Sequence, residues 1–399
     1  MRSASLPKCS QTLVGDRRYG HVQREASRSN SDNQSLGQKR RFSSGRESVE
    51  MRSVMIAERR VGFGKPVFII AEAGVNHNGD VRLARQLVDA AKDAGADAVK
   101  FQSFGAERLV SAAAPKAVYQ LQTTDAAESQ LEMLRRLELS SEAYRELFLH
   151  CQARGILFLS TPFDEENVDL LDALGVPAFK VGSGDLTNSE FLRYVAQRGK
   201  PVILSTGMST LDEVEAAVRV IGDAKCHELI LLHCVSCYPA DPAEANLRAM
   251  GTMAAAFHTP VGFSDHTLGM EVTMAAVALG ACVIEKHITL DRAMPGPDHR
   301  ASFEPEEFKQ FCMTLRRVES SLGDGTKRPT PNERDTARVA RRSLHAAHDL
   351  EKGGPLRAED FVARRPGTGV SAADLESVLT RRLTRSVSEG EMLREQDLE

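Results

Sequence analysis

The sequence predicts an α/β fold, a closed (β/α)8 TIM barrel followed by a small C-terminal domain. Eight short apolar segments alternate with helical segments between residues 60 and 325. Such alternation builds right-handed parallel β-α-β units, and eight units over roughly 260 residues match a closed barrel better than an open sheet. A reactive or hydrogen-bonding side chain follows nearly every predicted strand, as expected where all strand ends open onto one face.

The predicted strands are β-branched or apolar runs at 67–70, 98–101, 156–159, 178–181, 201–204, 229–232, 261–263 and 282–284. Between them, segments such as 81–94 and 211–221 repeat apolar residues with the period of an amphipathic helix. Residues 326–337 are polar, contain two prolines and are predicted to form a linker. We expect 338–399 to form the small domain, which is near the lower size limit for an independent core and should dock against another surface.

Composition excludes several classes of protein. Of the 399 residues 42% are hydrophobic and 27% charged, and the formal net charge is −4. No apolar run is long enough to span a membrane, and the slightly acidic balance argues against a nucleic-acid partner. Seven cysteines, an odd number, give no disulfide framework, so we expect a reducing, cytoplasmic setting.

The first 50 residues differ from the rest of the chain. They hold ten Ser and ten Lys plus Arg against five Asp plus Glu, a local charge of +5, so the remaining 349 residues carry −9. They have no apolar periodicity and no apolar core of a secretory signal. We therefore predict a disordered, Ser/Arg-rich tail over residues 1–55.

Two histidines are candidate metal ligands. His266 and His287 follow the seventh and eighth predicted strands, which are neighbours in a closed barrel, and each stands near an acidic residue. Imidazole is a common ligand of divalent transition metals. With Glu72 or Glu285 nearby, the pair predicts a mixed nitrogen and oxygen site for Mn²⁺, with Mg²⁺ or Co²⁺ as alternatives. Hydrogen-bonded core histidines are the competing interpretation.

A second group of side chains predicts an anion pocket. Two lysines on the second and fourth strands point into the same bowl as four hydroxyl groups, and the turn at 182–184 adds backbone N–H groups. Ammonium groups, hydroxyls and free N–H groups together suit a phosphate. The residues are Lys100, Lys180, Thr161, Ser183, Ser205 and Ser264. Cys234 and Cys237 lack the second cysteine pair of a structural zinc site, so we interpret their spacing as incidental.

Several motifs resemble the sialic acid synthase family, which includes N-acetylneuraminate and N,N'-diacetyllegionaminate synthases. They are AEAGVNHNG at 71–79, VKFQ at 99–102, STPFD at 160–164, STGM at 205–208, FSDHT at 263–267, IEKH at 284–287 and PGPDH at 295–299. Residues 341–399, with RRPG at 364–367, resemble the antifreeze-like (SAF) domain that ends those enzymes. The likeness runs from about residue 65 to the C-terminus.

The resemblance implies condensation of phosphoenolpyruvate with an N-acetylmannosamine-type sugar and water, which releases phosphate and gives a nine-carbon 2-keto acid. It also implies a domain-swapped homodimer in which Arg365 of the C-terminal domain reaches the N-acetyl group of the sugar. Glu72 is the implied acid/base, with Lys100, His266 and His287 as the other catalytic residues. The implied substrate-binding residues are the anion-pocket residues together with Gln102, Asp185, Ser236, Tyr238, Glu285 and Asp298.

The acceptor sugar is less sharply predicted than the chemistry. Asp185 and Ser236 depart from the residues most common in the family, Glu and Asn or Thr, at positions that face the substrate. We expect N-acetylmannosamine, giving N-acetylneuraminate. The alternatives are its 6-phosphate and 2,4-diacetamido-2,4,6-trideoxymannose, the precursor of N,N'-diacetyllegionaminate. Segment 119–131 resembles bacterial members of the neuraminate and legionaminate groups alike.

Two other classes of protein share the barrel. A class I aldolase would use Lys100 or Lys180 as a Schiff base. A non-catalytic sugar-binding barrel would keep the bowl without needing a metal.

Overall fold

The computed structural model describes residues 52–125 and 127–399. Residues 1–51 of the predicted tail therefore lie outside the described part of the chain. Strand β1 (Val54–Ile56) begins inside the range predicted for the tail and pairs in antiparallel register with β2 (Arg59–Val61). The folded region thus starts at Val54, before the predicted end of the tail at residue 55.

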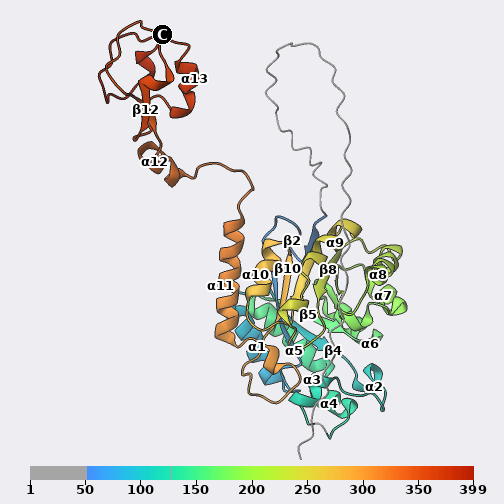
Figure 1. The fold of residues 1–399 in the computed structure, drawn as a ribbon. Helices are drawn as coiled ribbons and strands as arrows, with labels where there is room; N and C mark the ends of the chain where they lie inside the picture. The colour runs from blue at the N-terminus through green and yellow to red at the C-terminus, as the bar shows by residue number, and fades with distance from the viewer. Residues whose placement is uncertain (1–51, 126) are drawn as a thin grey trace, which may run out of the picture. The chain divides into compact units, whose positions relative to one another are not determined.

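Eight parallel strands form the barrel that the sequence predicts (Figure 1). The first and last of them pair, from Phe68 opposite Val283 to Glu72 opposite His287. The hydrogen-bonded order is β5-β4-β3-β10-β9-β8-β7-β6, and β5 and β6 contact each other. The bounds are Phe68–Gly74 (β3), Ala98–Ser103 (β4), Leu157–Pro162 (β5), Phe179–Val181 (β6), Val202–Ser205 (β7), Leu229–Cys234 (β8), Val261–Asp265 (β9) and Val283–His287 (β10).

Alternation along each strand divides the barrel interior into an apolar and a polar end. Successive side chains of a strand point to opposite faces, so residues two apart share the interior. In β3 the buried interior residues Phe68 and Ile70 are followed by Glu72, and in β7 Ile203 is followed by Ser205. The same step from apolar to polar side chains recurs around the ring, which places the charged groups at the carboxyl ends of the strands.

The opposite end of the barrel is closed by the β1–β2 hairpin. Its Val54, Ile56 and Val61 are buried in one cluster with Phe68, Ile70 and other interior residues of the strands. Burial of these apolar side chains stabilises the closed ring. The hairpin thus fills the bottom of the barrel, and the polar layer above it lies at the other end.

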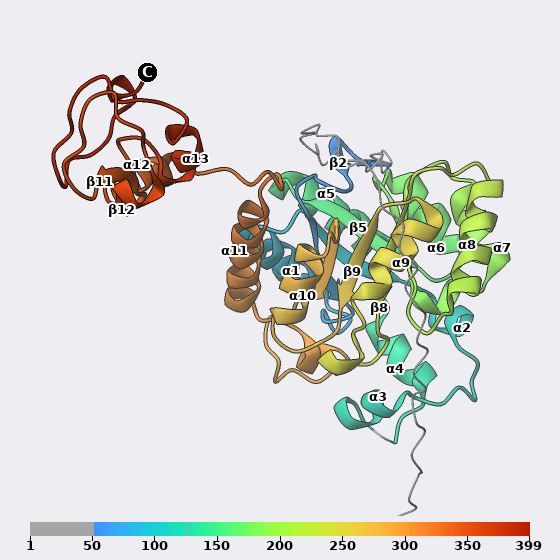
Figure 2. The same ribbon diagram turned by 45° about the horizontal axis from the view of Figure 1, so that its top comes forward.

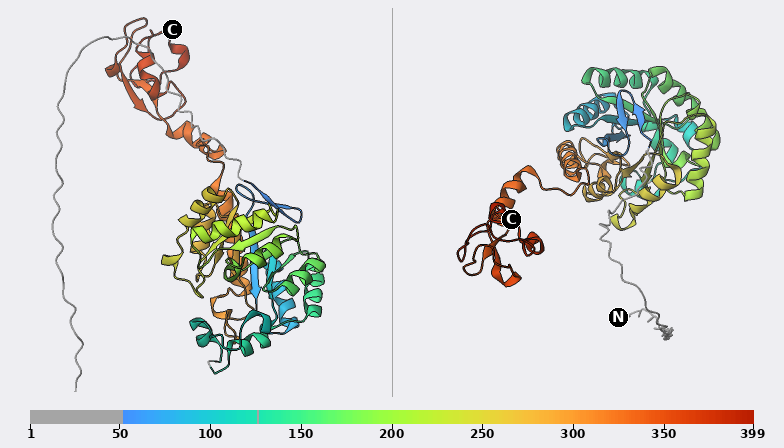
Figure 3. Two further views of the ribbon diagram at one scale, coloured as in Figure 1. Left: turned by 90° about the vertical axis from the view of Figure 1, so that its right-hand side faces the viewer. Right: turned by 90° about the horizontal axis from the view of Figure 1, so that it is seen from above.

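Helices surround the strands, as the right-hand view in Figure 3 shows. Figure 2 shows α1, α10 and α11 along one side of the barrel, where α11 contacts both of the others. Their buried faces form the main hydrophobic core against the outer faces of the strands. The bounds are Val81–Ala94 (α1), Ser141–Arg154 (α5), Glu165–Leu174 (α6), Ser189–Ala196 (α7), Leu211–Asp223 (α8), Arg248–Phe257 (α9), Glu271–Ala278 (α10) and Pro305–Leu322 (α11).

Three further helices lie in a long insertion between β4 and α5: α2 (Ala106–Leu109), α3 (Val118–Thr123) and α4 (Gln130–Leu137). The side chain of Lys116 is only 2% exposed and connects two parts of this segment. Its ammonium lies 2.9 Å from Glu128 Oε1 and donates to the carbonyl of Asp125 at 2.7 Å. A buried charge with a carboxylate and a carbonyl partner holds the segment in one conformation.

The C-terminal region has a core of its own. Helix α12 (Pro331–Ala340) begins within the stretch predicted to be a linker, because Thr330 and Glu333 form a capping box there. The antiparallel strands β11 (Ser343–Ala346) and β12 (Phe361–Arg364), with α13 (Leu375–Val378), enclose a separate apolar cluster. In the described part of the chain, no helix combines the length and apolar character that a membrane crossing requires.

Gly262 in β9 tests the packing of the barrel interior. A Cβ at this position would lie against the carbonyl oxygen of Val283 and 2.7 Å from Cδ2 of Leu232. We predict that Gly262→Ala lowers the free energy of unfolding by about 1–3 kcal/mol through overpacking. Gly251→Ala is the matched control, since Gly251 is exposed on α9 with open space around an added Cβ. That change should stabilise the protein by about 1 kcal/mol, and equal urea midpoints for both variants would contradict the packing argument.

Candidate active site

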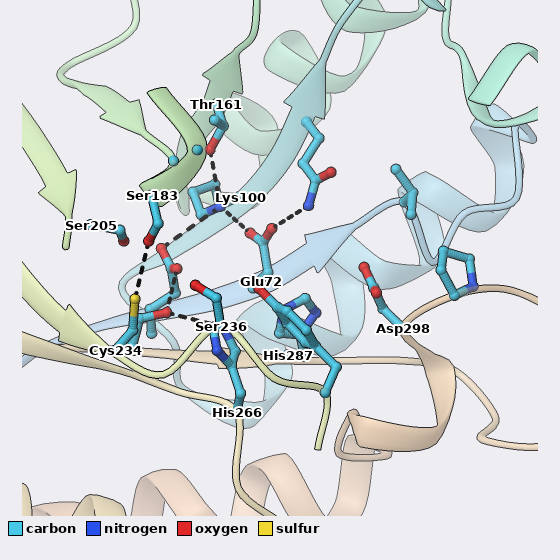
Figure 4. Close-up of a pocket in the computed structure, with 18 of the residues that line it drawn as sticks. Glu72, Lys100, Thr161, Ser183, Ser205, Cys234, Ser236, His266, His287 and Asp298 are labelled. Atoms are coloured by element: carbon cyan, nitrogen blue, oxygen red, sulfur yellow. Dashed lines mark hydrogen bonds and ion pairs between the residues drawn. The ribbon is translucent and has the colours of Figure 1, made fainter. Parts of the chain in front are cut away.

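A cavity of about 310 Å³ lies at the carboxyl ends of the strands, and all eight strands contribute to its lining. It gathers most of the predicted site residues, although they come from distant parts of the sequence (Figure 4). Because interior positions recur every second residue, each strand presents its last inward side chain to this cavity. The predicted residues in the lining are Glu72, Lys100, Gln102, Thr161, Lys180, Ser183, Ser205, Ser236, Tyr238, Ser264, His266, Glu285, His287 and Asp298.

Two lysines and two glutamates form a buried charge network at the centre. Lys100 Nζ lies 2.6 Å from Oε2 of Glu72 and 3.7 Å from Oε2 of Glu285. Lys180 Nζ lies 3.6 Å from Oε1 of Glu285. All four side chains are at most 6% exposed, so each charge depends on its partners rather than on water.

The two glutamates have opposite electrostatic surroundings. Burial raises the pKa of Glu72, and the neighbouring Lys100 offsets this only in part. Glu285 is equally buried, but the two ammonium groups outweigh burial and hold its pKa well below the usual range. Glu285 is therefore a fixed anion, whereas Glu72 is the carboxyl group poised to exchange a proton.

Gly74 makes room for Glu72 at the end of β3. The strand has a register shift between residues 72 and 74, and Gly74 takes the left-handed φ of 52°. A Cβ there would lie 3.2 Å from Oε1 of Glu72 and 3.3 Å from Nε2 of Gln102. Gln102 Nε2 donates to Glu72 Oε1 at 3.1 Å, so the irregularity leaves space for the pair that orients the acid/base candidate.

Hydroxyl groups surround the ammonium groups. Lys100 donates to Thr161 Oγ1 at 3.2 Å and Lys180 to Ser205 Oγ at 2.8 Å. Ser264 Oγ donates to Glu285 Oε1 at 2.8 Å. This set of cations and short polar side chains has the composition of a phosphate- and carboxylate-binding pocket.

Ser183 completes the hydroxyl side of the pocket. Its Oγ accepts from the backbone N–H of Gly207 at 2.9 Å and lies 3.2 Å from Cys234 Sγ. Cys234 lines the cavity and is buried, whereas Cys237 is exposed. The two cysteines thus face different surroundings, in keeping with an incidental spacing.

The two histidines lie side by side in the lining, with ring centroids 5.6 Å apart. His266 Nδ1 donates to the carbonyl of Val235 at 2.7 Å, so Nε2 is the unprotonated nitrogen, and it lies 3.4 Å from Ser264 Oγ. Nδ1 of His287 is buried and has no hydrogen-bond partner among the described residues. Burial lowers the pKa of both imidazoles, so both are neutral, the form that binds a metal.

The two histidines therefore fit a divalent ion. The carboxylate expected beside them, Glu72 or Glu285, lies near a lysine. The part of the chain that the structure describes contains no group of three or more His, Cys, Asp and Glu residues arranged for an ion. Glu72 and Glu285 are instead paired with the lysines. That one of them completes the metal site stays a prediction.

Aromatic and acidic residues form the other side of the cavity. The ring of Tyr238 lies 4.1 Å from that of His266 and 5.1 Å from that of Tyr119. Asp298 is buried, and burial together with the charge of Glu72 raises the pKa of its carboxyl to about 7. These groups offer hydrogen bonds to a neutral, hydroxyl-rich molecule.

Asp185 and Arg365 are absent from the lining of the cavity. Asp185 ends a short 3-10 turn (Ser183–Asp185), and burial raises the pKa of its carboxyl to about 6. Arg365 is exposed in the C-terminal region. Both were predicted to bind substrate, and for both residues this role stays a prediction.

Part of the lining was not predicted from the sequence. Cys234 has the same inward parity as Leu232 in β8, a signal that was available. The other missed residues come from loops and the α3–α4 insertion, where no strand parity applies. They are Val75, Tyr119, Gln120, Met133, Leu134, Leu137, Phe163, Met208 and Pro297, with Gly182 and Gly184 from the turn already noted.

Lys286 is another missed residue, with a supporting role. It has the opposite parity to Glu285 and His287, so it points out of the barrel and is fully buried. Its ammonium lies 3.0 Å from Asp265 Oδ2 and donates to the carbonyls of Thr267 and Gly269. This buried pair fixes the loop that follows β9 and carries His266.

Comparisons with known proteins agree with this geometry. A model of the NeuB family matches residues 87–327, and a model of the SAF domain matches 341–399. The chain is 48% identical to the N,N'-diacetyllegionaminic acid synthase of Campylobacter jejuni, over 83% of this chain and 100% of the relative. The enzyme of the same name from Legionella pneumophila is 46% identical, over 83% of this chain and 94% of the relative.

Two further similarities are lower in identity. Human N-acetylneuraminate-9-phosphate synthase is 35% identical over 85% of this chain and 94% of the relative. The solved structure of N-acetylneuraminic acid synthetase from Leptospira borgpetersenii, in complex with citrate, superposes with a TM-score of 0.63 and 35% identity. It covers 72% of this chain and 95% of that one.

Asp298 makes the stability of the site depend on pH. Its folded pKa of about 7 lies above the value near 4 of an unfolded chain. Between about pH 4 and pH 7 the folded state therefore binds more protons than the unfolded state, and stability falls as the pH rises. The difference between the two pKa values corresponds to roughly 4 kcal/mol. This contribution to the free energy of unfolding is present below about pH 4 and is lost above about pH 7.

We predict that Asp298→Asn flattens this part of the pH profile, because asparagine keeps the shape of the side chain without titrating. The variant should gain stability relative to the wild type as the pH rises from about 4 to about 8. Urea unfolding at several pH values measures the difference. Parallel profiles for the two proteins would show that Asp298 is not the responsible group.

Proposed function

The chain belongs to the NeuB family, and from that membership we propose that it condenses phosphoenolpyruvate with 2,4-diacetamido-2,4,6-trideoxymannose and water to give N,N'-diacetyllegionaminate and phosphate. It is accordingly a transferase that forms a carbon–carbon bond from phosphoenolpyruvate. The observation that carries the proposal is the cavity itself, in which a cation and hydroxyl pocket faces a pair of neutral histidines.

The comparisons favour a different acceptor from the one placed first in the sequence analysis. Identity is 48% and 46% to two N,N'-diacetyllegionaminic acid synthases, against 35% to an N-acetylneuraminate-9-phosphate synthase. N-acetylmannosamine, the acceptor first expected, becomes the second candidate.

The charge of the cavity also supports an acceptor without phosphate. Among the described residues that line it, the lysine and arginine side chains are Lys100 and Lys180 alone. Both are needed for the carboxylate and phosphate of phosphoenolpyruvate, and both already face glutamates. A 6-phosphate on the sugar would meet no further lysine or arginine of this lining, and burying an unpaired dianion is costly.

In the proposed mechanism the pocket binds and orients phosphoenolpyruvate. Lys100 and Lys180 neutralise its anionic groups, and the hydroxyls that now bond to the lysines turn toward its oxygens. Glu285 stays ionised and keeps both ammonium groups charged in the buried site. The enol carbon is thereby held toward the side of the cavity that carries Gln102 and Asp298.

Glu72 moves the protons. The enol carbon C3 bonds to the aldehyde carbon of the open-chain sugar, and Glu72 gives a proton to the aldehyde oxygen. Water adds to C2, and Glu72 takes up one of its protons. The tetrahedral intermediate then breaks its C2–O bond to phosphate, and its hydroxyl proton leaves as the 2-keto group forms. The raised pKa of Glu72 suits both transfers.

The histidine pair is proposed to hold the metal. His266 and His287 would bind Mn²⁺, with Mg²⁺ or Co²⁺ as alternatives, and the ion would supply Lewis acidity to the aldehyde oxygen of the sugar. The carbonyl of Val235 fixes the tautomer of His266 so that Nε2 carries the lone pair a metal would take.

We further propose a domain-swapped homodimer, in which Arg365 of one subunit serves the cavity of the other. Support comes from the SAF-domain match over residues 341–399, which includes Arg365, and from the exposed side chain of that arginine. A cytoplasmic setting is also proposed, because the cysteines of the described residues are all free thiols.

A product assay by mass spectrometry tests the proposed reaction. Phosphoenolpyruvate is supplied with each of N-acetylmannosamine, its 6-phosphate and 2,4-diacetamido-2,4,6-trideoxymannose. We predict the highest kcat/KM with the diacetamido sugar and no product from the 6-phosphate. Conversion of N-acetylmannosamine alone would instead support the acceptor first expected. Borohydride trapping of a covalent adduct on Lys100 or Lys180 would point to a Schiff-base aldolase.

We predict that His266→Ala lowers kcat by more than roughly 100-fold. Loss of a residue that only supports a metal ligand costs up to about 100-fold, and loss of the ligand itself should cost more. The matched control is His227→Ala, because His227 is exposed and precedes β8 at the other end of the barrel. Phosphate release with and without EDTA gives the rates. Equal activity of the two variants, or no effect of EDTA on the wild type, contradicts the role of the metal.

A further inference from the structure

One wall of the cavity is apolar, although most of the remaining lining is polar. Met133, Leu134 and Leu137 of α4 line it together with Val75 and Phe163, and we call these five residues the α4 wall. Their side chains offer no hydrogen-bond donor or acceptor apart from the weak thioether of Met133. Whatever part of a substrate contacts this wall without loss of hydrogen bonds is therefore apolar.

The α4 wall is packed in place. Val75, Met133 and Leu137 are buried in a cluster of their own, against which Leu134 and Phe163 pack. Met133 is 1% exposed. Outside the cluster, Ser129 and Glu132 form a capping box at the start of α4.

Ion pairs anchor α4 to the preceding segment. Arg136, at the end of α4, pairs at 2.5 Å with Glu128, whose other oxygen faces the buried Lys116. The helix is thus held at both ends, and its apolar face is presented to the cavity as a preformed surface.

The α4 wall lies on the side of the cavity proposed for the sugar. Val75 follows Glu72 by three residues, and Pro297, which precedes Asp298, belongs to the same lining. A neighbouring cavity of about 340 Å³ shares Met133, Leu137 and Pro297 with it. Phosphoenolpyruvate has two anionic groups and no methyl group, so the lysine pocket accounts for it without using the α4 wall.

We infer that the α4 wall selects the acceptor by packing against one of its methyl groups. The inference rests on the proposed function and identifies Leu134 as a specificity-determining residue. The methyl group is either C6 of a 6-deoxy sugar or the end of the acetamido group at C4. In a hydrophobic pocket one such group changes kcat/KM by roughly 10- to 200-fold.

Three variants separate packing from stability. Leu134→Gln places an amide in the α4 wall, and Leu134 is half-buried, so the substitution is compatible with folding. Leu134→Met keeps the surface apolar at similar volume. Leu131→Gln is the matched control, because Leu131 lies half-buried on the same helix and does not line the cavity.

Three sugars separate the two sources of the methyl group. N-acetylmannosamine has a C6 hydroxyl, its 6-deoxy analogue has a C6 methyl, and 2,4-diacetamido-2,4,6-trideoxymannose adds the C4 acetamido group. Phosphate release gives kcat/KM for each sugar and the KM for phosphoenolpyruvate. Calorimetry gives the affinity of each sugar in the absence of turnover.

We expect the wild type to show a higher kcat/KM for sugars with a C6 methyl or a C4 acetamido group than for those without. Leu134→Gln should reduce this ratio of kcat/KM values at least 10-fold and leave the KM for phosphoenolpyruvate unchanged. Leu134→Met and Leu131→Gln should keep that preference. If the preference is lost only between N-acetylmannosamine and its 6-deoxy analogue, the α4 wall contacts the C6 methyl group. If it is lost only between the 6-deoxy analogue and the diacetamido sugar, the α4 wall contacts the C4 acetamido group.

Equal loss with all three sugars, or no change in preference, overturns the inference. If the wild type releases no phosphate with any of the sugars, the proposed function fails. In that case the sugar affinities measured by calorimetry still test the inference. Equal affinity of the wild type for all three sugars overturns it.

Discussion

The arrangement of this protein depends on a buried network of two ammonium and two carboxylate groups at the mouth of the barrel. Lys100 lies between Glu72 and Glu285, and Lys180 faces Glu285 from the other side. Removing one such ion from water costs several kcal/mol, so each charge is stable only while its partners keep their places. The strand register that aligns Glu72 with Lys100 is therefore an electrostatic requirement as well as a consequence of folding.

Much of the surrounding structure serves to hold that network. The β1–β2 hairpin fills the apolar bottom of the barrel, and the polar layer occupies the other end. Outside the ring, the buried Lys286–Asp265 pair fixes the loop that carries His266. The network also places two cations inside a folded region whose formal charge is −9, which supports the proposed anion site. Its cations are concentrated where water is excluded and their field is strongest, so the acidic exterior has little effect there.

Sequence predicted the barrel and most of the site because both follow from strand parity. Each strand ends with an inward polar residue, and in a closed ring those residues meet. The α4 wall was beyond such reasoning, since Leu134 lies in an insertion whose path no strand register defines. Glu72 or Glu285 was expected beside the metal, and only the distances show that both carboxylates lie against lysines. Helix α12 starts in a stretch whose prolines suggested a linker, because one of them, Pro331, occupies the first helical position, where proline is tolerated.

We propose that the buried lysines bind the anionic groups of phosphoenolpyruvate, independently of the sugar side. Calorimetric titration of phosphoenolpyruvate into the wild type, Lys180→Met and the exposed control Lys225→Met measures this most directly. Loss of one buried cationic partner should weaken phosphoenolpyruvate binding by about 100-fold or more in Lys180→Met. Sugar affinity should stay unchanged, and Lys225→Met should match the wild type. Unaltered phosphoenolpyruvate affinity in Lys180→Met would contradict the account.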